Sequence, residues 1–227
     1  MTWQKWLADY LRVALPQGFD AAEWSEKMSA KPKAKLVALC AGLMCCVSAA
    51  WADWQVGAGS QVQFISIKNN AIGEVSHFET LSGTVTDSGV VSVKVALASV
   101  ETNIGIRNER MQKMLFEVGL YPEATITAQV DPEALGEAVS GASGVVPVSL
   151  QIALHGEVVN KDASFRVAPT AQGLSATTVQ PILLSASEFA LEEGVAALQQ
   201  IAGLNAISRV IPVTVDLKLV PVEPESP

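Results

Sequence analysis

Alternation between apolar and polar residues, repeated along the chain, is the feature that most limits its fold. The segments 91–97, 146–154 and 213–219 each place an apolar residue at every second position. In the first of them the apolar residues are Val91, Val93, Val95 and Leu97. Side chains of an extended chain alternate between two faces, so each segment has one apolar face. Strands of this kind are typical of antiparallel sheets that cover a core on one side.

Further segments have strand character and are separated by turn sequences such as Asp87-Ser88-Gly89. They span residues 60–67, 73–85, 124–130, 164–169 and 173–183. About eight strands joined by turns indicate a sandwich or an up-and-down barrel. Closure into a barrel is favoured because it leaves no exposed sheet edge. We therefore predict an all-β fold, an antiparallel β-barrel of about eight strands.

Two segments interrupt the strand pattern with helical spacing. In 106–118, Met111, Leu115 and Val118 recur on one side of a helix. In 187–202 we expect Ser187 to cap the start of a helix, and Gly203 to end it. The expected fold is then a barrel with two short helices near its mouth.

The segment 28–52 has the features of a secretory signal peptide. Its lysines between positions 31 and 35 precede the uncharged segment 36–52, and Ala50 and Ala52 supply the small residues that a signal peptidase needs. Cleavage is expected after Ala52. A transmembrane helix is the alternative, but about 17 residues without a charged flank after them is a marginal length for a bilayer.

Residues 1–27 lie upstream of a signal that has its own Met28, and we interpret them as an extension from a start codon assigned too early. The mature domain is then 53–227, and its expected location is the periplasm. All the cysteines lie within the signal segment: Cys40, Cys45 and Cys46. The mature domain therefore has no disulfide, and its core alone must stabilise the fold.

Composition and motifs exclude several classes of function. The net charge of −8 and a pI near 4.8 argue against nucleic acid or an anionic membrane surface as a partner. The sequence contains no G-x-S-x-G, no H-E-x-x-H and no glycine-rich phosphate loop after a strand. His77 and His155, the only histidines, lack the spacing of a metal site. We expect them to make hydrogen bonds at strand ends, and we predict a protein that is not an enzyme.

An ordered succession of short motifs resembles the YceI-like family of periplasmic polyisoprenoid-binding proteins. The resemblance covers most of the mature chain and rests on the segments 60–64, 83–85, 100–104, 106–110, 121–126, 154–156, 189–204 and 210–213. Many family members have Arg-Asp where this chain has Arg107-Asn108, which removes one arginine–carboxylate pair. The resemblance implies a lipocalin-like barrel whose lumen holds a long isoprenoid, such as a quinone tail or a polyprenyl carrier, with no cofactor beyond such a lipid.

Inward-facing apolar residues are the candidates for the wall of a lipid tunnel. They are Phe64, Phe78, Val93, Val95, Phe116, Leu150, Ile152, Phe165 and Phe189. The alternative is that the same side chains are the packed core of a filled barrel, which sequence cannot distinguish from a hollow one. A continuous apolar tunnel lined by about eight strands would suit an extended lipid.

Arg107 and Arg110 are candidates for binding a diphosphate or quinone head group, since a guanidinium donates two parallel hydrogen bonds. The alternative is surface ion pairing with Glu101, Glu109 or Glu117.

Two other functions stay open at this level. One is a structural or interaction module for a membrane partner of the cytochrome type, whose signature would be a solid core and an exposed apolar patch. The other is an enzyme with an apolar substrate, which would need a perturbed acid, base or nucleophile inside the cavity. The oligomeric state is not indicated by the sequence.

Overall fold

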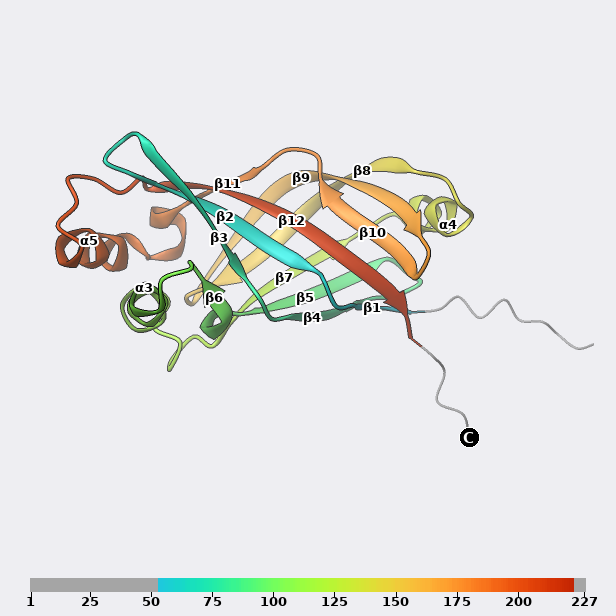
Figure 1. Ribbon diagram of the computed structural model, residues 1–227. Helices are drawn as coiled ribbons and strands as arrows, with labels where there is room; N and C mark the ends of the chain where they lie inside the picture. Colours follow the sequence, from blue (N-terminus) through green and yellow to red (C-terminus); the bar gives the residue numbers. More distant parts are fainter. Residues whose placement is uncertain (1–52, 223–227) are drawn as a thin grey trace, which may run out of the picture. The chain divides into compact units, whose positions relative to one another are not determined.

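The structure, a computed structural model, describes residues 53–222. The expectations for 1–27, for a signal peptide over 28–52 and for cleavage after Ala52 therefore concern residues outside the described part of the chain. The described residues contain an antiparallel sheet (Figure 1). Its strands are β1 (Trp54–Val56), β2 (Gln61–Lys68), β3 (Ile72–Phe78), β4 (Leu81–Val85), β5 (Val90–Ala96), β6 (Val100–Glu101), β7 (Glu123–Gln129), β8 (Gly144–Leu154), β9 (Glu157–Thr170), β10 (Gly173–Thr178), β11 (Ile182–Ser185) and β12 (Val210–Pro221).

The sheet closes on itself as an up-and-down barrel. Hydrogen-bonded neighbours follow the order β1-β4-β5-β7-β8-β9-β10-β12, and β12 returns to pair with β1, with Trp54 opposite Pro221. Four further strands continue these towards the other end of the barrel: β2 continues β1, β3 continues β4, β6 continues β5, and β11 continues β10. At that end β2 also pairs with β12. The structure thus confirms an antiparallel β-barrel of eight long strands.

Several long strands are broken in the middle, which the alternation pattern did not reveal. The expected strands 73–85 and 173–183 are each two strands, β3 with β4 and β10 with β11. Pro181 lies in the second break, where its ring nitrogen has no hydrogen to donate to a ladder. Between β1 and β2, Gly59 has φ of 82°, a left-handed conformation that favours glycine.

Helical segments cover the end of the barrel that we call the mouth end (Figure 1). The expected helix 106–118 is α3 (Gly105–Arg110) continued by a π-helical turn, η2 (Met111–Leu115). The expected helix 187–202 is the 3-10 helix η3 (Ala186–Phe189) followed by α5 (Glu192–Ile201). Ala190, with φ of 52°, interrupts it. The prediction of Ser187 as the cap is therefore wrong, since Ser185 precedes η3 and its N–H donates to Glu188 Oε2 at 2.9 Å.

Tight contacts fix the helical cover in place. Gly194 of α5 lies so close to η2 that a Cβ there would be 2.7 Å from the Met114 carbonyl oxygen. The loop after α5 is joined to the turn between β2 and β3, where Asn69 Oδ1 accepts from Asn205 N–H at 2.9 Å. A short 3-10 helix, η1 (Leu97–Ser99), joins β5 to β6 and buries Leu97.

The sequence analysis missed a third helix, α4 (Pro132–Val139), at the opposite end of the barrel, which we call the α4 end (Figure 1). Asp131 caps it, accepting from Glu133 N–H at 3.0 Å, and Pro132 occupies its first turn. This Asp-Pro pair is a standard helix start. Leu135 and Ala138 are buried, so α4 covers the lumen at this end.

Candidate functional site

A cavity of about 570 Å³ runs along the inside of the barrel. Leu135 of α4 and Leu219 of β12 line it at the α4 end, and Ile201 and Ile207 line it at the mouth end. The barrel is therefore hollow along its length, which is the geometry that an elongated apolar ligand requires.

All the residues expected to face the lumen line this cavity: Phe64, Phe78, Val93, Val95, Phe116, Leu150, Ile152, Phe165 and Phe189. The strand period places the seven that lie on strands, as in β8, which alternates buried and exposed residues from Val146 to Ile152, whereas Phe116 and Phe189 belong to the helical cover. The structure brings these side chains together. Contact of each with a ligand stays a prediction.

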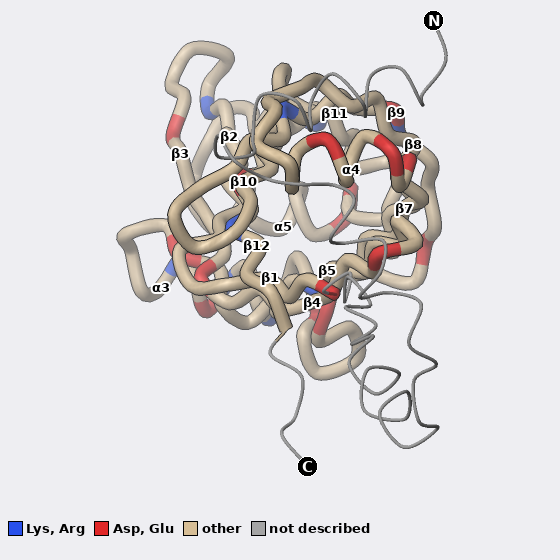
Figure 2. Tube along the Cα trace, turned by 90° about the vertical axis from the view of Figure 1, so that its right-hand side faces the viewer, with Lys and Arg blue, Asp and Glu red and all other residues tan. Residues whose placement is uncertain are grey.

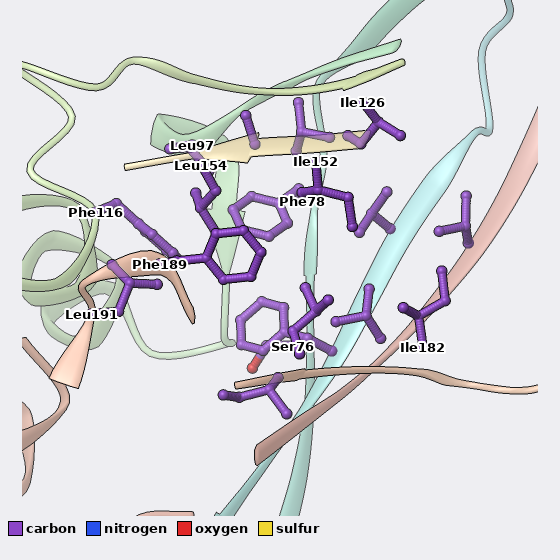
Figure 3. A pocket seen from close by; sticks show the side chains of 18 of the residues that line it. Ser76, Phe78, Leu97, Phe116, Ile126, Ile152, Leu154, Ile182, Phe189 and Leu191 are labelled. Atoms are coloured by element: carbon purple, nitrogen blue, oxygen red, sulfur yellow. The ribbon is translucent and has the colours of Figure 1, made fainter. Parts of the chain in front are cut away.

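Aromatic rings gather below the helical cover (Figure 3). The ring of Phe78 lies 5.5 Å from that of Phe64 and 5.7 Å from that of Phe116, centroid to centroid. Phe189, on η3, is buried among the lining side chains. Tilted rings at this spacing pack favourably and offer polarisable surface to an unsaturated chain.

Ser76 is the polar side chain most enclosed by the barrel wall, and sequence reasoning missed it. It is 2% exposed, lines the cavity and points its hydroxyl towards the lumen (Figure 3). Its neighbour Val75 is 58% exposed. The pairing of β2 with β3 explains why Ser76 and not the apolar Val75 faces inwards. Ser76 lies opposite Phe64, whose ring faces the lumen. The small side chain leaves room beside that ring.

A polar cluster at the mouth joins α3 to the β2–β3 hairpin. The Glu74 carboxylate accepts from Arg107 Nη1 and pairs with Lys68 Nζ at 2.7 Å. Arg107 Nη2 donates to the Thr102 carbonyl oxygen at 2.6 Å. Both cations line the cavity, as does Arg110. The alternative partners Glu101, Glu109 and Glu117 are wrong for Arg107, since its ion pair is with Glu74.

The side chain of Asn108, the residue after Arg107, makes hydrogen bonds to the segment 101–102. Its Oδ1 accepts from the Thr102 hydroxyl at 2.6 Å, while its Nδ2 donates to Glu101 Oε2 at 2.9 Å. An ionised aspartate has no hydrogen to donate to Glu101. Asparagine at position 108, in place of the aspartate of the Arg-Asp pattern, can therefore donate to Glu101. The carboxylate that pairs with Arg107 comes from Glu74.

Arg107 keeps one donor unused. Its Nε is buried and makes no hydrogen bond within residues 53–222. A buried donor without a partner is costly, and a ligand oxygen would satisfy it. Arg110 makes no ion pair with any described residue and is half-buried. Both side chains are placed where a head group at the mouth would lie, although binding by them stays a prediction.

The hydrogen bond from Lys68 and the adjacent Arg107 hold the pKa of Glu74 below its ordinary value of 4.5, against the opposing effect of partial burial. The lowered pKa means that Glu74 stabilises the fold above about pH 4.5, and that this stabilisation is lost as the pH falls through the folded-state pKa. We expect Glu74→Gln to lower the free energy of unfolding at pH 7 by up to about 1 kcal/mol and to flatten its decline at acid pH. Urea unfolding between pH 7 and pH 3 measures both.

Glu109→Gln is the matched control, since among the described residues Glu109 pairs with Lys113 alone, at 3.8 Å on an exposed helix face. A Glu74→Gln curve that coincides with that of the control at every pH would contradict the role given to Glu74.

Neither His77 nor His155 lines the cavity. His155, in the turn between β8 and β9, bonds through Nε2 to Glu117 Oε2 at 2.9 Å and packs on the Tyr121 ring at 4.4 Å. This hydrogen bond at a strand end agrees with the sequence expectation. In the part of the chain that the structure describes, no group of His, Cys, Asp and Glu has the arrangement of a metal site. None of the helices there is long and apolar enough to cross a membrane.

Other lining residues were not among the tunnel candidates named from the sequence. They include Met111, Leu115, Ile182, Leu184, Leu191 and Val195. Ile182 and Leu184 follow the strand alternation and could have been found by extending it past Pro181. Those on the helical cover could not, because helical periodicity does not show what a helix covers.

Comparison with known proteins supports the barrel fold. The sequence profile of the YceI-like domain matches residues 54–219. The structure of a polyisoprenoid binding domain from Saccharophagus degradans, implicated in plant cell wall breakdown, superposes with a TM-score of 0.72 at 32% identity. The match covers 76% of this chain and 99% of that domain.

Burkholderia cenocepacia BcnA shares the fold, with a TM-score of 0.54 at 17% identity over 70% of this chain and 94% of that one. A search of curated protein sequences finds no match.

Proposed function

Because the chain belongs to the YceI-like domain family, we propose that it binds a polyisoprenoid lipid inside the barrel. The observation that carries the proposal is the apolar cavity of about 570 Å³ that extends from α4 to the mouth. The structurally similar domain from Saccharophagus degradans, 32% identical, is a polyisoprenoid binding domain.

The lining explains how such a ligand would be held. Each methylene removed from water contributes about 0.8 kcal/mol, so a chain of several isoprene units gains enough to bind without a charged anchor. The cost of ordering the lipid is reduced because the closed barrel is already formed. A cavity also differs from the solid core expected of a purely structural module. A membrane cytochrome as partner stays a prediction.

The head group is proposed to lie at the mouth, beside Arg107. Two cations, Lys68 and Arg107, share the carboxylate of Glu74, and Arg107 Nε finds no acceptor among residues 53–222. Both facts favour acceptor oxygens, as in a quinone carbonyl or a prenyl phosphate. The tail would then extend past Phe78 towards α4.

The proposed location is the periplasm, where the protein would carry the lipid between membranes. The apolar segment 36–52 with its small residues at Ala50 and Ala52 supports export, and the barrel begins immediately after it, at Trp54. We expect binding, not catalysis, to be the activity.

Solvent extraction of the purified protein followed by mass spectrometry tests the proposal. We expect a prenyl lipid at close to one molecule per barrel, absent from an unrelated protein purified from the same cells. The fragment masses also distinguish a quinone from a prenyl phosphate. A protein that yields no prenyl lipid, and that takes up no added long-tailed quinone after extraction, would refute it.

A further inference from the structure

The rim of the cavity mouth is apolar and exposed. Ile104 and Ile106 at the start of α3 and Ile201 at the end of α5 all line the cavity, yet they are 47%, 55% and 48% exposed. These three residues, called the rim isoleucines below, therefore continue the apolar lining of the lumen onto the outer surface. Large apolar side chains clustered at an opening mark a contact surface.

Cations accompany the rim isoleucines. Lys68, Arg107 and Arg110 line the same part of the cavity, with Glu74 as the carboxylate bonded between the first two. Isoleucines with adjacent Lys and Arg suit the boundary between the acyl chains and the phosphate groups of a bilayer.

The opposite end of the barrel differs from the rim of the mouth in its charged residues. Its loops and α4 carry only acidic charges: Asp53, Asp87, Asp131, Glu133 and Glu137. Residues 86–89, 130–143 and 171–172, which make up these loops, contain no lysine or arginine. Figure 2, which faces this end, shows acidic segments around α4 and near β4 and β5. At the mouth end α5 also begins with two glutamates, Glu192 and Glu193, but the charged residues that line the cavity there are the cations Lys68, Arg107 and Arg110.

We propose that the mouth end docks on a phospholipid bilayer, with the rim isoleucines entering the interface and Lys68, Arg107 and Arg110 facing the phosphates. The acidic α4 end then points away from the membrane, because carboxylates are repelled by the phosphate layer. The inference rests on the proposed function in one respect: docking opens the lumen directly to the layer in which an isoprenoid resides.

Hydrogen exchange with vesicles locates the contact. The purified protein, its N-terminus read by mass spectrometry, is mixed with vesicles of phosphatidylethanolamine and a minor share of phosphatidylglycerol. We expect slower amide exchange in 102–110 and 201–208, and unchanged exchange in 86–89 and 131–143. Because the readout is local, binding through another part of the chain does not imitate it. Slowing centred on the α4 end, or no slowing at either end, would overturn the proposal.

Flotation with the same vesicles tests the rim isoleucines. Ile104→Ser with Ile201→Ser should lower the partition coefficient about tenfold or more, since each change removes about half an isoleucine side chain from the apolar phase. Ile104 precedes the first residue of α3, where serine is a favoured cap, so the fold should tolerate it.

The matched control is Val90→Ser with Val145→Ser, two similarly exposed residues at the barrel's other end. Equal flotation of the two double variants would overturn the proposal. Flotation measures how much protein binds to the vesicles, whether or not the barrel contains a lipid. A barrel found by extraction to hold no lipid would contradict the proposed function, but the flotation result would still test docking.

Discussion

Replacing Ser76 with phenylalanine should leave a folded barrel that no longer holds a long lipid. Ser76 is almost completely buried, yet its hydroxyl points into an open lumen midway along β3. A phenyl ring there would lie across the path between the mouth and α4. Losing only two or three methylenes of enclosed tail would weaken binding by about tenfold to fiftyfold. Extraction and mass spectrometry measure the bound lipid per barrel.

Val75→Phe is the control for this variant. Val75 is the next residue on the same strand and faces outwards, so the same substitution should leave the bound lipid unchanged. The melting temperature reports folding for both. Where Ser76→Phe does not fold, Ala176→Phe places a ring in the lumen from β10. A folded lumen variant that carries as much lipid as the control would contradict a ligand that extends along the barrel.

Gly83→Ala should be among the most destabilising single changes in the wall. Gly83 has φ of 147° inside β4, and a Cβ there would be 2.2 Å from the Ser92 carbonyl oxygen of β5. The methyl group meets backbone, which cannot rotate away, so the pairing of β4 with β5 must shift. We expect the free energy of unfolding to fall by about 3 kcal/mol or more, as measured by urea unfolding.

Gly59→Ala separates the two causes of this effect. Gly59 also has positive φ, at 82°, but apart from its chain neighbours no atom lies within 4 Å of the position that a methyl group would take there. Its substitution should cost only the backbone strain, about 1 kcal/mol. Equal losses for the two variants would show that close strand approach at Gly83 is not what requires glycine there.

The strand framework was predictable because alternation is a local property. In β5 and β8 every second residue is apolar, and the structure turns those residues inwards, as for Val93 and Ile152. A two-residue period fixes the face of each side chain once one face is buried. The candidate tunnel residues on the strands could therefore be named before the strand order was known.

Other features depend on contacts between distant parts of the chain. Ser76 faces inwards because Phe64 lies opposite it, although the local pattern would turn Val75 inwards. Glu74 pairs with Arg107, 33 positions away, which no spacing rule connects. The alternation of apolar and polar residues does not predict whether the barrel contains a cavity. A filled and a hollow barrel have the same pattern and differ in the distance across the lumen.

Closure of the barrel has a consequence for the order of folding. Its last seam joins β1, only three residues long, to the end of β12, with Trp54 opposite Pro221. Contacts between the two extremes of a domain are the slowest to form, because the loop entropy of nearly the whole domain must be lost first. The ring therefore cannot close until its final strand has been synthesised. The hollow interior therefore exists only after the seam has formed.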